Sequence, residues 1–327
     1  MHAEWFGITV QDIIFPLFVT LSGCGLAFAY RNRVGWAATL RRSVVLLLCG
    51  LAYNAVAAAS IDVSELRVTG PLQVYAVLVL VIGVLHQVAR TPMAWAAVTG
   101  AITLAQAGLF LAWEASCSAG VLSPECNPSA TIDVAAFGAA HVYRSGAAGH
   151  DPEGLVAILG ALLTACVGTT AGHLALSARG TTKGPGRLMG WAGLVGAVAV
   201  VAFLLLPVMK RLWTTPFALG VAALGVLLLA GGMVLLDRPA GVRWTHLRER
   251  LAWPLIGMGR NSLLVYFGSH LLMLTLLMNG GSSSWAEEVA RAVDVVGHPR
   301  LSFVVAMLLG WGALAAVLHR RRIYLRP

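Results

Sequence analysis

The chain has 327 residues, of which 58% are hydrophobic and only 11% charged, well below the roughly 25% charged content of soluble domains. This composition excludes a soluble globular protein and predicts an all-α, polytopic integral membrane helical bundle. The net charge of +9 fits basic loops facing anionic lipid headgroups and requires no nucleic-acid partner.

Long apolar runs follow one another along the chain, and they predict about nine transmembrane helices. A span needs about 20 apolar residues because the hydrocarbon core is ~30 Å thick, and runs of that length cross it as helices. The predicted spans are Asp12–Tyr30, Ser43–Ala59, Pro71–Val88, Met93–Trp113, Leu155–Leu176, Leu188–Met209, Phe217–Leu236, Pro254–Met278 and Leu301–Leu318. We expect one transmembrane domain over residues 1–327.

Basic residues gather in alternate loops and therefore predict the orientation of the chain. Arg31, Arg33, Arg41 and Arg42 fall between the first two predicted spans, and the tail HRRRIYLRP is also basic. Cytoplasmic loops carry the excess of arginine and lysine. We therefore expect a multi-pass protein of the cell membrane with its N-terminus outside and its C-terminus in the cytosol.

The five cysteines fall into two groups. Cys117 and Cys126 lie nine residues apart in the longest outside loop, where a disulfide that staples the loop competes with two free thiols. Cys24, Cys49 and Cys166 lie in spans, where a buried structural thiol is expected. Because no CxxC or HxxxH spacing occurs, we expect no metal site.

Ionisable residues stand near the predicted outer ends of the helices. Asp12 opens an apolar run, where an acid either caps the helix or faces a polar cavity. Arg67 is the basic residue of its loop, and such arginines commonly snorkel to the interface. Asp151 precedes Pro152 and Glu153 in a pattern typical of a helix start, which predicts that Asp151 is the N-cap.

Several other polar residues leave two interpretations open. Lys210 and Arg211 adjoin Trp213, a combination typical of interface anchors. Arg260 precedes Asn261 at the predicted cytosolic end of a span, where the arginine either snorkels or meets a phosphate. Loop histidines such as His141, His150 and His298 are usually only solvated, but several on one face favour a proton-handling site.

Six motifs in the same order resemble those of one family, heparan-α-glucosaminide N-acetyltransferase and its bacterial transmembrane relatives. The matching segments are HAEWFGITVQDIIFPLFVTLSG, LRVTGPLQVYAV, HVYRSGAAGHDPEGL, KRLWTTPFAL, GMGRNSLLVYFGSH and HRRRIYLRP. The resemblance implies an acyltransferase that moves an acetyl group from cytosolic acetyl-CoA to the amine of an extracytoplasmic glucosamine-type sugar. A glycan acceptor and the lipid bilayer are the expected partners, and a homodimer is a candidate assembly.

The resemblance also implies roles for individual residues. His2 matches the family's catalytic histidine and is followed by Asp12 at the family's spacing. Either His2 acts as general base, or it carries the acetyl group transiently. Arg67, Asp151 and Asn261 match other motif positions, while His141 and Arg260 are candidate substrate and CoA contacts.

In the family a helix precedes the catalytic histidine, whereas this sequence begins at Met1. We expect ten spans if an upstream helix belongs to the protein. The alternative function is a permease or a noncatalytic membrane protein of the same fold.

Overall fold

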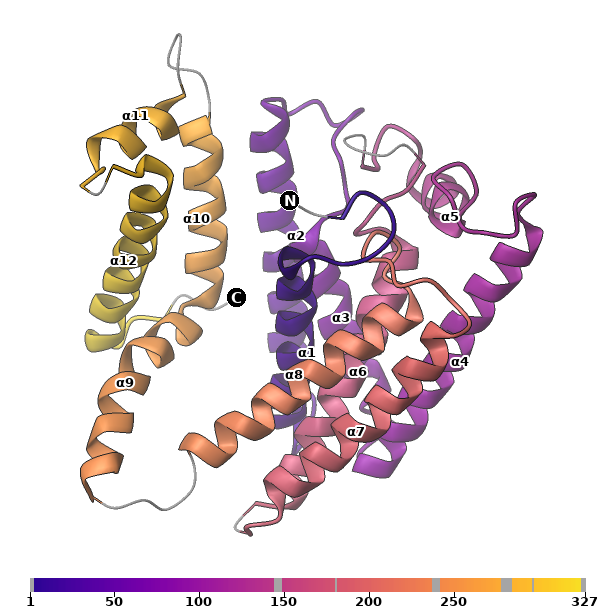
Figure 1. Ribbon diagram of the computed structural model, residues 1–327, viewed down its shortest axis with the longest axis horizontal. Coiled ribbons are helices and arrows are strands. Elements are labelled where there is room, and N and C mark those ends of the chain that lie inside the picture. Colours follow the sequence, from indigo (N-terminus) through magenta and orange to yellow (C-terminus); the bar gives the residue numbers. More distant parts are fainter. Residues whose placement is uncertain are drawn as a thin grey trace. The chain divides into compact units, whose positions relative to one another are not determined.

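The computed structural model describes residues 3–143, 149–179, 181–236, 242–277, 284–295 and 297–324. Within those ranges it contains α-helices and no β-strand. The helices are α1 (Val10–Tyr30), α2 (Trp36–Ala58), α3 (Pro71–Leu85), α4 (Pro92–Ser116), α5 (Pro128–Phe137), α6 (Leu155–Ser177), α7 (Gly184–Phe203), α8 (Thr215–Leu236), α9 (Val242–Arg260), α10 (Ser262–Leu277), α11 (Trp285–Ala292) and α12 (Pro299–Arg320) (Figure 1).

Seven of these helices are long and apolar enough to cross a membrane, and the apolar helices α3 and α10 are shorter. The prediction of an all-α, polytopic membrane protein is therefore confirmed. The predicted span Pro254–Met278 is wrong as a single helix, because α9 ends at Arg260 and α10 begins at Ser262. The Asn261 amide donates to the carbonyl of Gly257, a local bond of the kind that competes with the helical backbone.

Two other predicted boundaries differ from the structure. The span predicted to end at Met209 stops as α7 at Phe203, because the Thr214 hydroxyl accepts from the Met209 amide and donates to the Pro207 carbonyl in a closed turn. At the other boundary, α2 begins at Trp36 instead of Ser43. Arg41 and Arg42 consequently lie within a candidate span and not in the loop before it.

The chain divides into two compact units. The first comprises Met1–Ala55 and Ile61–Arg238, and the second comprises Val56–Ser60 and Pro239–Pro327. The first unit therefore holds α3 to α8 together with α1 and most of α2. The second holds α9 to α12. The prediction of one transmembrane domain over residues 1–327 stays a prediction.

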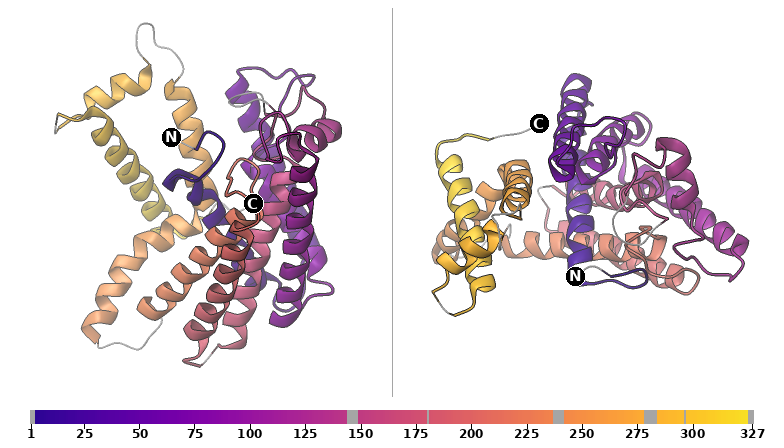
Figure 2. Two further views of the ribbon diagram at one scale, coloured as in Figure 1. Left: turned by 45° about the vertical axis from the view of Figure 1, so that its right-hand side comes forward. Right: turned by 90° about the horizontal axis from the view of Figure 1, so that it is seen from above.

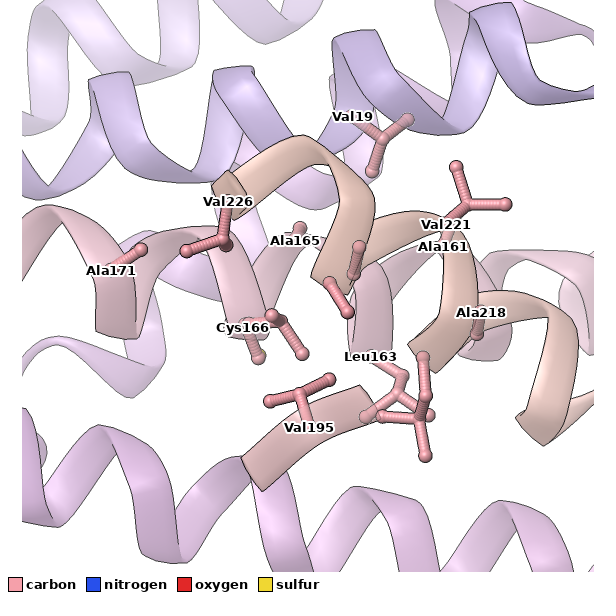
Figure 3. Close-up of a cluster of buried hydrophobic side chains, with 14 of the residues drawn as sticks. Val19, Ala161, Leu163, Ala165, Cys166, Ala171, Val195, Ala218, Val221 and Val226 are labelled. Atoms are coloured by element: carbon pink, nitrogen blue, oxygen red, sulfur yellow. The ribbon is translucent and has the colours of Figure 1, made fainter. Parts of the chain in front are cut away.

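Helix α6 is the centre of the first unit. It packs against α1, α3, α4, α5, α7 and α8, and its buried side chains lie on every side of the helix. Figure 3 shows Leu163, Ala165 and Cys166 of α6 facing valine and alanine side chains of neighbouring helices. A helix that is apolar all round belongs in the interior of a bundle, and that is the position of α6.

Small residues bring α6 close to α1. Gly168 and Gly172 form a GxxxG pattern on α6, and a Cβ added at Gly168 would overlap the backbone of Thr20 in α1. On the α1 side, a Cβ at Gly23 would overlap the backbone of Ala165. Glycines at these positions let two helix backbones approach within a membrane, where close packing replaces the hydrophobic effect as the driving force.

One end of the first unit is built of loops and short helices, and we call it the disulfide end. Cys117 and Cys126 form a disulfide there, between α4 and α5. Helices α1, α3, α6 and α8 all begin at this end (Figures 1 and 2). The polar residues of the first unit that the family motifs contain gather at the same end.

The second unit pairs α9 with α12 through aromatic contacts. The rings of Trp253 and His319 lie 5.1 Å apart, and Arg260 donates a hydrogen bond to the hydroxyl of Tyr324. Gly268 of α10 leaves room for the ring of Trp311 in α12, because a Cβ at that position would overlap the ring. These contacts fix the helices of the second unit relative to one another.

Candidate active site

The loop before α1 is tied to the disulfide end by hydrogen bonds from both sides of Ala3. The Ala3 amide donates to Oδ2 of Asp12 at 3.2 Å, and its carbonyl accepts from Nε of Arg211 at 3.3 Å. The Trp5 indole donates to the carbonyl of Leu122, close to the disulfide loop. The predicted catalytic residue, His2, lies outside the described residues, but its neighbour Ala3 is held on both sides.

Asp12 caps α1 and also receives the N-terminal loop. Its carboxylate accepts from the amide and the hydroxyl of Thr9, each at 2.8 Å, which completes a capping box at the start of the helix. The side chain is buried, with 1% exposed. The capping interpretation of Asp12 is therefore confirmed, while its predicted catalytic role stays a prediction.

Arg67 lies at the centre of a network of charged side chains. Its Nη2 donates to Oδ1 of Asp151 and to Oε2 of Glu153, both at 2.7 Å, and its Nε donates to the Thr69 hydroxyl. Lys210 completes the network 3.9 Å from the second oxygen of Glu153. We call these five residues the Arg67 cluster. The guanidinium meets two carboxylates, contacts that the snorkelling interpretation of Arg67 did not predict.

The charges of the Arg67 cluster fix its protonation. Burial would lower the pKa of Arg67, but the carboxylates of Glu153 and Asp151 outweigh burial and raise that pKa above its ordinary value. The guanidinium therefore remains a fixed cation. Its carbon also lies 4.8 Å from the centre of the Tyr143 ring, so the cation is covered on one side by an aromatic face.

The backbone that carries Arg67 is clamped between two other segments. The Asn54 amide on α2 donates to the carbonyls of Arg67 and Thr69, at 2.7 and 2.8 Å. His141 holds the other side, since its Nδ1 lies 2.8 Å from the carbonyl of Leu66 and its own carbonyl accepts from Val68. His141 therefore positions the Arg67 loop in this structure, while its predicted contact with a substrate stays a prediction.

Asp151 is not the N-cap of α6, so that prediction is wrong. Helix α6 begins at Leu155, and its free amide groups donate to the carboxylate of Asp133 in α5. Asp151 instead accepts from the Thr69 hydroxyl at 2.6 Å and from the Tyr143 amide at 2.9 Å. A residue distant in sequence supplies the cap, which releases Asp151 to bind Arg67.

A second polar group lies beside the N-terminal loop. The His150 ring is buried, with an edge-to-face contact to Trp5 at 5.3 Å and another to Tyr143 at 5.9 Å. Arg211 Nη1 lies 3.5 Å from Nε2 of His150. Because a guanidinium only donates, Arg211 is the donor in this contact.

Sequence analysis missed the involvement of Lys210 and Arg211. Their interpretation as interface anchors did not predict that Lys210 faces Glu153 and that Arg211 binds Ala3. Trp213 is fully buried and donates to the Thr164 hydroxyl, so it is not an interface residue. The signal available in the sequence was two adjacent cations in a loop predicted to lie outside, where basic residues are scarce.

Arg260 and Asn261 belong to the second unit, where the surroundings of each are defined within that unit. Arg260 is exposed and contacts Tyr324, with its guanidinium carbon 5.2 Å from the ring centre. Asn261 is fully buried at the break between α9 and α10. Their predicted contacts with CoA stay predictions. The first unit brings together Asp12, Arg67, His141 and Asp151 at the disulfide end.

The site at the disulfide end offers fixed cations, paired carboxylates and a buried imidazole. Such a set suits proton transfer and stabilisation of a developing oxyanion. Among the described residues, no group of three or more histidine, cysteine or acidic side chains is arranged to hold a metal ion.

Comparison with known proteins finds a family model and two curated proteins that are similar to this chain. Residues 1–126 match the model of a family described as heparan-alpha-glucosaminide N-acetyltransferase, catalytic. The chain is 21% identical over 386 residues to the heparan-alpha-glucosaminide N-acetyltransferase of Homo sapiens, covering 99% of this chain and 55% of that protein. The Mus musculus protein of the same name is also 21% identical, over 388 residues and 56% of its length. The chain thus spans about half the length of the curated relatives it matches.

Proposed function

Because these comparisons support assigning the chain to the heparan-α-glucosaminide N-acetyltransferase family, we propose that it is an integral-membrane acyltransferase. It moves the acetyl group of acetyl-CoA to the amine of a glucosamine-type sugar, which can be part of a glycan. The disulfide end faces away from the cytosol, in agreement with the basic loops at the opposite ends of the helices. The membrane is the cell membrane.

One observation carries this proposal: Ala3 is bound by both Asp12 and Arg211, at the end of the first unit that holds the Arg67 cluster. Ala3 directly follows the histidine that the family resemblance marks as catalytic. Ala3 has little freedom because both its amide and its carbonyl are bound. General-base catalysis requires a base that is held in position beforehand. Asp12, already buried, then serves both as a helix cap and as an orienting carboxylate.

In the reaction, the sugar amine attacks the thioester carbonyl carbon of acetyl-CoA. The C–N bond forms, the C–S bond breaks and CoA leaves as its thiolate. His2 accepts the proton that the amine loses, as a general base. The cations Lys210 and Arg211 stabilise the oxyanion that develops on the carbonyl oxygen. A route through an acetylated His2 uses the same groups in two successive transfers.

The sugar-binding surface follows from the Arg67 cluster. Glu153 keeps 10% of its side chain exposed, and its carboxylate oxygens can accept hydrogen bonds from sugar hydroxyls, whereas Asp151 is buried and holds Arg67 in place. The positive charges of Arg67 and Lys210 offset these acids and keep this surface close to neutral. A neutral, oxygen-rich wall suits a sugar better than it suits a strongly charged acceptor.

Turnover by the purified full chain tests the proposal. The chain is reconstituted in nanodiscs with acetyl-CoA and glucosamine, and thiol release and N-acetylglucosamine are measured together. We expect the two products in equal amounts and no release with N-acetylglucosamine as acceptor, because its amine is already blocked. Thiol release without acetylated sugar, or no release at all, would overturn the proposed function.

A further inference from the structure

Arg42 is a cation inside the candidate span α2 that has no counter-charge among the described residues. Arg42 lies about 9 Å from the start of α2, at a rise of ~1.5 Å per residue. The next residue, Ser43, is buried and donates to the Ala76 carbonyl. The Arg42 side chain is half-buried, and its Nε is enclosed without a hydrogen-bond partner among the residues that the structure describes. Ionisable side chains at such depth usually mark a ligand pathway.

The side chain of Arg42 faces the helices of the first unit. The ionisable groups that act on it electrostatically are the hydroxyls of Tyr30 on α1 and Tyr75 on α3, and neither is an acid at neutral pH. A snorkelling arginine would point along the helix toward water. Arg41, the preceding residue, is exposed and provides a direct contrast. Among the residues that the structure describes, Arg42 therefore has no anion beside it.

Gln73 on α3 presents a second unpaired donor, at the level of Gly50 on α2. The side chain is 5% exposed, and its Nε2 has no hydrogen-bond partner among the described residues. Its amide group fills space that glycines leave open, since a Cβ at Gly50 or at Gly70 would overlap it. A buried amide nitrogen without an acceptor is costly, which indicates that an acceptor arrives from outside the chain.

Contacts between α2 and α3 show the order of these donors along the bundle. From the Arg67 cluster inward, Asn54 contacts Thr69, Gly50 adjoins Gln73, and Ser43 next to Arg42 contacts Ala76. Asn54 and Ser43, at the first and last levels, are eleven positions apart on α2, a rise of roughly 16 Å. Gln73 and Arg42 thus form an inner continuation of the site at the disulfide end.

We propose that Arg42 and Gln73 bind an oxygen-rich anionic group, a phosphate ester, in the interior of the first unit. The guanidinium fork supplies paired donors and the charge, and the Gln73 amide donates to another oxygen of the same ligand, farther towards the disulfide end. Two sources carry this chemistry: the phosphates of the acyl donor and the headgroup of a membrane lipid. The first source rests on the proposed function, whereas the second does not.

Binding of free CoA to the full chain in nanodiscs tests the site, with isothermal calorimetry as the readout. We expect Arg42→Gln to weaken CoA at least about tenfold, since one charge-assisted contact is lost, and Arg42→Lys to restore part of the affinity. Gln73→Met keeps the shape but not the amide, and should weaken CoA a few-fold. Arg41→Gln, the matched exposed control, should leave the affinity unchanged. Thermal melting of each variant checks its folding.

Two further probes separate the sources. Pantetheine lacks phosphate, so Arg42→Gln should not alter its affinity if the guanidinium meets a phosphate of CoA. If instead CoA binds Arg42→Gln normally and native mass spectrometry shows the loss of a retained phospholipid, the site is a lipid site. If Arg42→Gln keeps both its affinity for CoA and its retained phospholipid, the proposal is overturned. If the parent chain does not bind CoA but binds pyrophosphate through Arg42, the anion site is supported and the proposed function is overturned.

Discussion

Arg67 and Asp151 are 84 positions apart in sequence, yet Nη2 of the arginine lies 2.7 Å from Oδ1 of the aspartate. The pair joins the loop before α3 to the loop before α6 and brings two motif segments into one site. Asp151 is inaccessible to solvent and Arg67 is partly exposed, so the charges are only partly hydrated. Removing Arg67 leaves the buried Asp151 without its cation, whereas removing Asp151 leaves Arg67 paired with Glu153 alone.

We predict that Arg67→Gln destabilises the first unit by about 2–3 kcal/mol, because Asp151 and Glu153 then lose their shared cation. Denaturant unfolding in detergent micelles measures the change. The double variant Arg67→Gln with Asp151→Asn should recover part of the loss, and Arg90→Gln, at an exposed arginine, should cost little. Additive effects of the two single substitutions would show that the ion pair is energetically unimportant.

The cap that Asp133 provides for α6 gives a second prediction. Asp133→Ala removes the acceptor of the Leu155 amide and should cost about 1–2 kcal/mol, whereas Asp133→Asn keeps an oxygen there and should cost less. Circular dichroism melts of the two variants at neutral pH provide the comparison. Equal losses for the two substitutions would contradict the capping role.

The same residue has a predictable pH dependence. Burial raises the pKa of Asp133, although hydrogen bonds from Ser129, Leu155 and Val156 act in the opposite direction. A carboxyl whose pKa is raised on folding stabilises the fold while it is protonated, and this contribution is lost as pH rises through the raised pKa. Relative to Asp133→Asn, the parent chain should therefore gain stability as pH falls from neutral towards the ordinary pKa of an aspartate. A flat difference across that range would be inconsistent with a buried carboxyl.

Close approach of α1 and α6 depends on Gly168. A methyl group there would overlap the backbone of Thr20, so Gly168→Ala should separate the helices and lower the melting temperature. Gly193→Ala on α7 is the matched control, because nothing lies within 4 Å of its added Cβ. That control should be neutral or slightly stabilising, since alanine favours the helix over glycine by up to about 1 kcal/mol. Indistinguishable melting temperatures for the two variants would argue against tight α1–α6 packing.

The disulfide between Cys117 and Cys126 should order the loop between α4 and α5. Thiol labelling of the denatured, unreduced protein is expected to spare these two cysteines and to modify Cys24, Cys49 and Cys166. Replacing both loop cysteines with serine should cost roughly 2–3 kcal/mol, the usual contribution of a short closed loop. Labelling of Cys117 and Cys126 without reductant would show that the bond does not form in the membrane protein.

Sequence patterns predicted most helices well because hydrophobic length is a local property. Runs such as Thr215–Leu236 contain no competing signal, so their positions follow from membrane thickness alone. The break at Asn261 could not be predicted in the same way. Its cause is a single amide that bonds the preceding turn inside an otherwise apolar run.

The sequence could predict which residues belong to the site, but not which residues they contact. Family motifs pointed to Arg67 and Asp151, yet the N-cap pattern at Asp151 was misleading, because Asp133 in another helix supplies the cap. Periodicity carries no information about partners so distant in sequence. The inward orientation of Arg42 was hidden for a related reason: a basic residue close to a predicted span looks like a topology signal until the helix start is known.

Sided turnover by His2→Ala tests the central claim most directly. The full chain and the variant are reconstituted in vesicles with acetyl-CoA on the face of the basic loops and glucosamine on the face of the disulfide end. We predict N-acetylglucosamine from the parent chain, a rate about 10²–10⁴ lower for His2→Ala, and an unchanged rate for the exposed control His246→Ala. Parent-like acetyl transfer by a correctly folded His2→Ala would contradict the account.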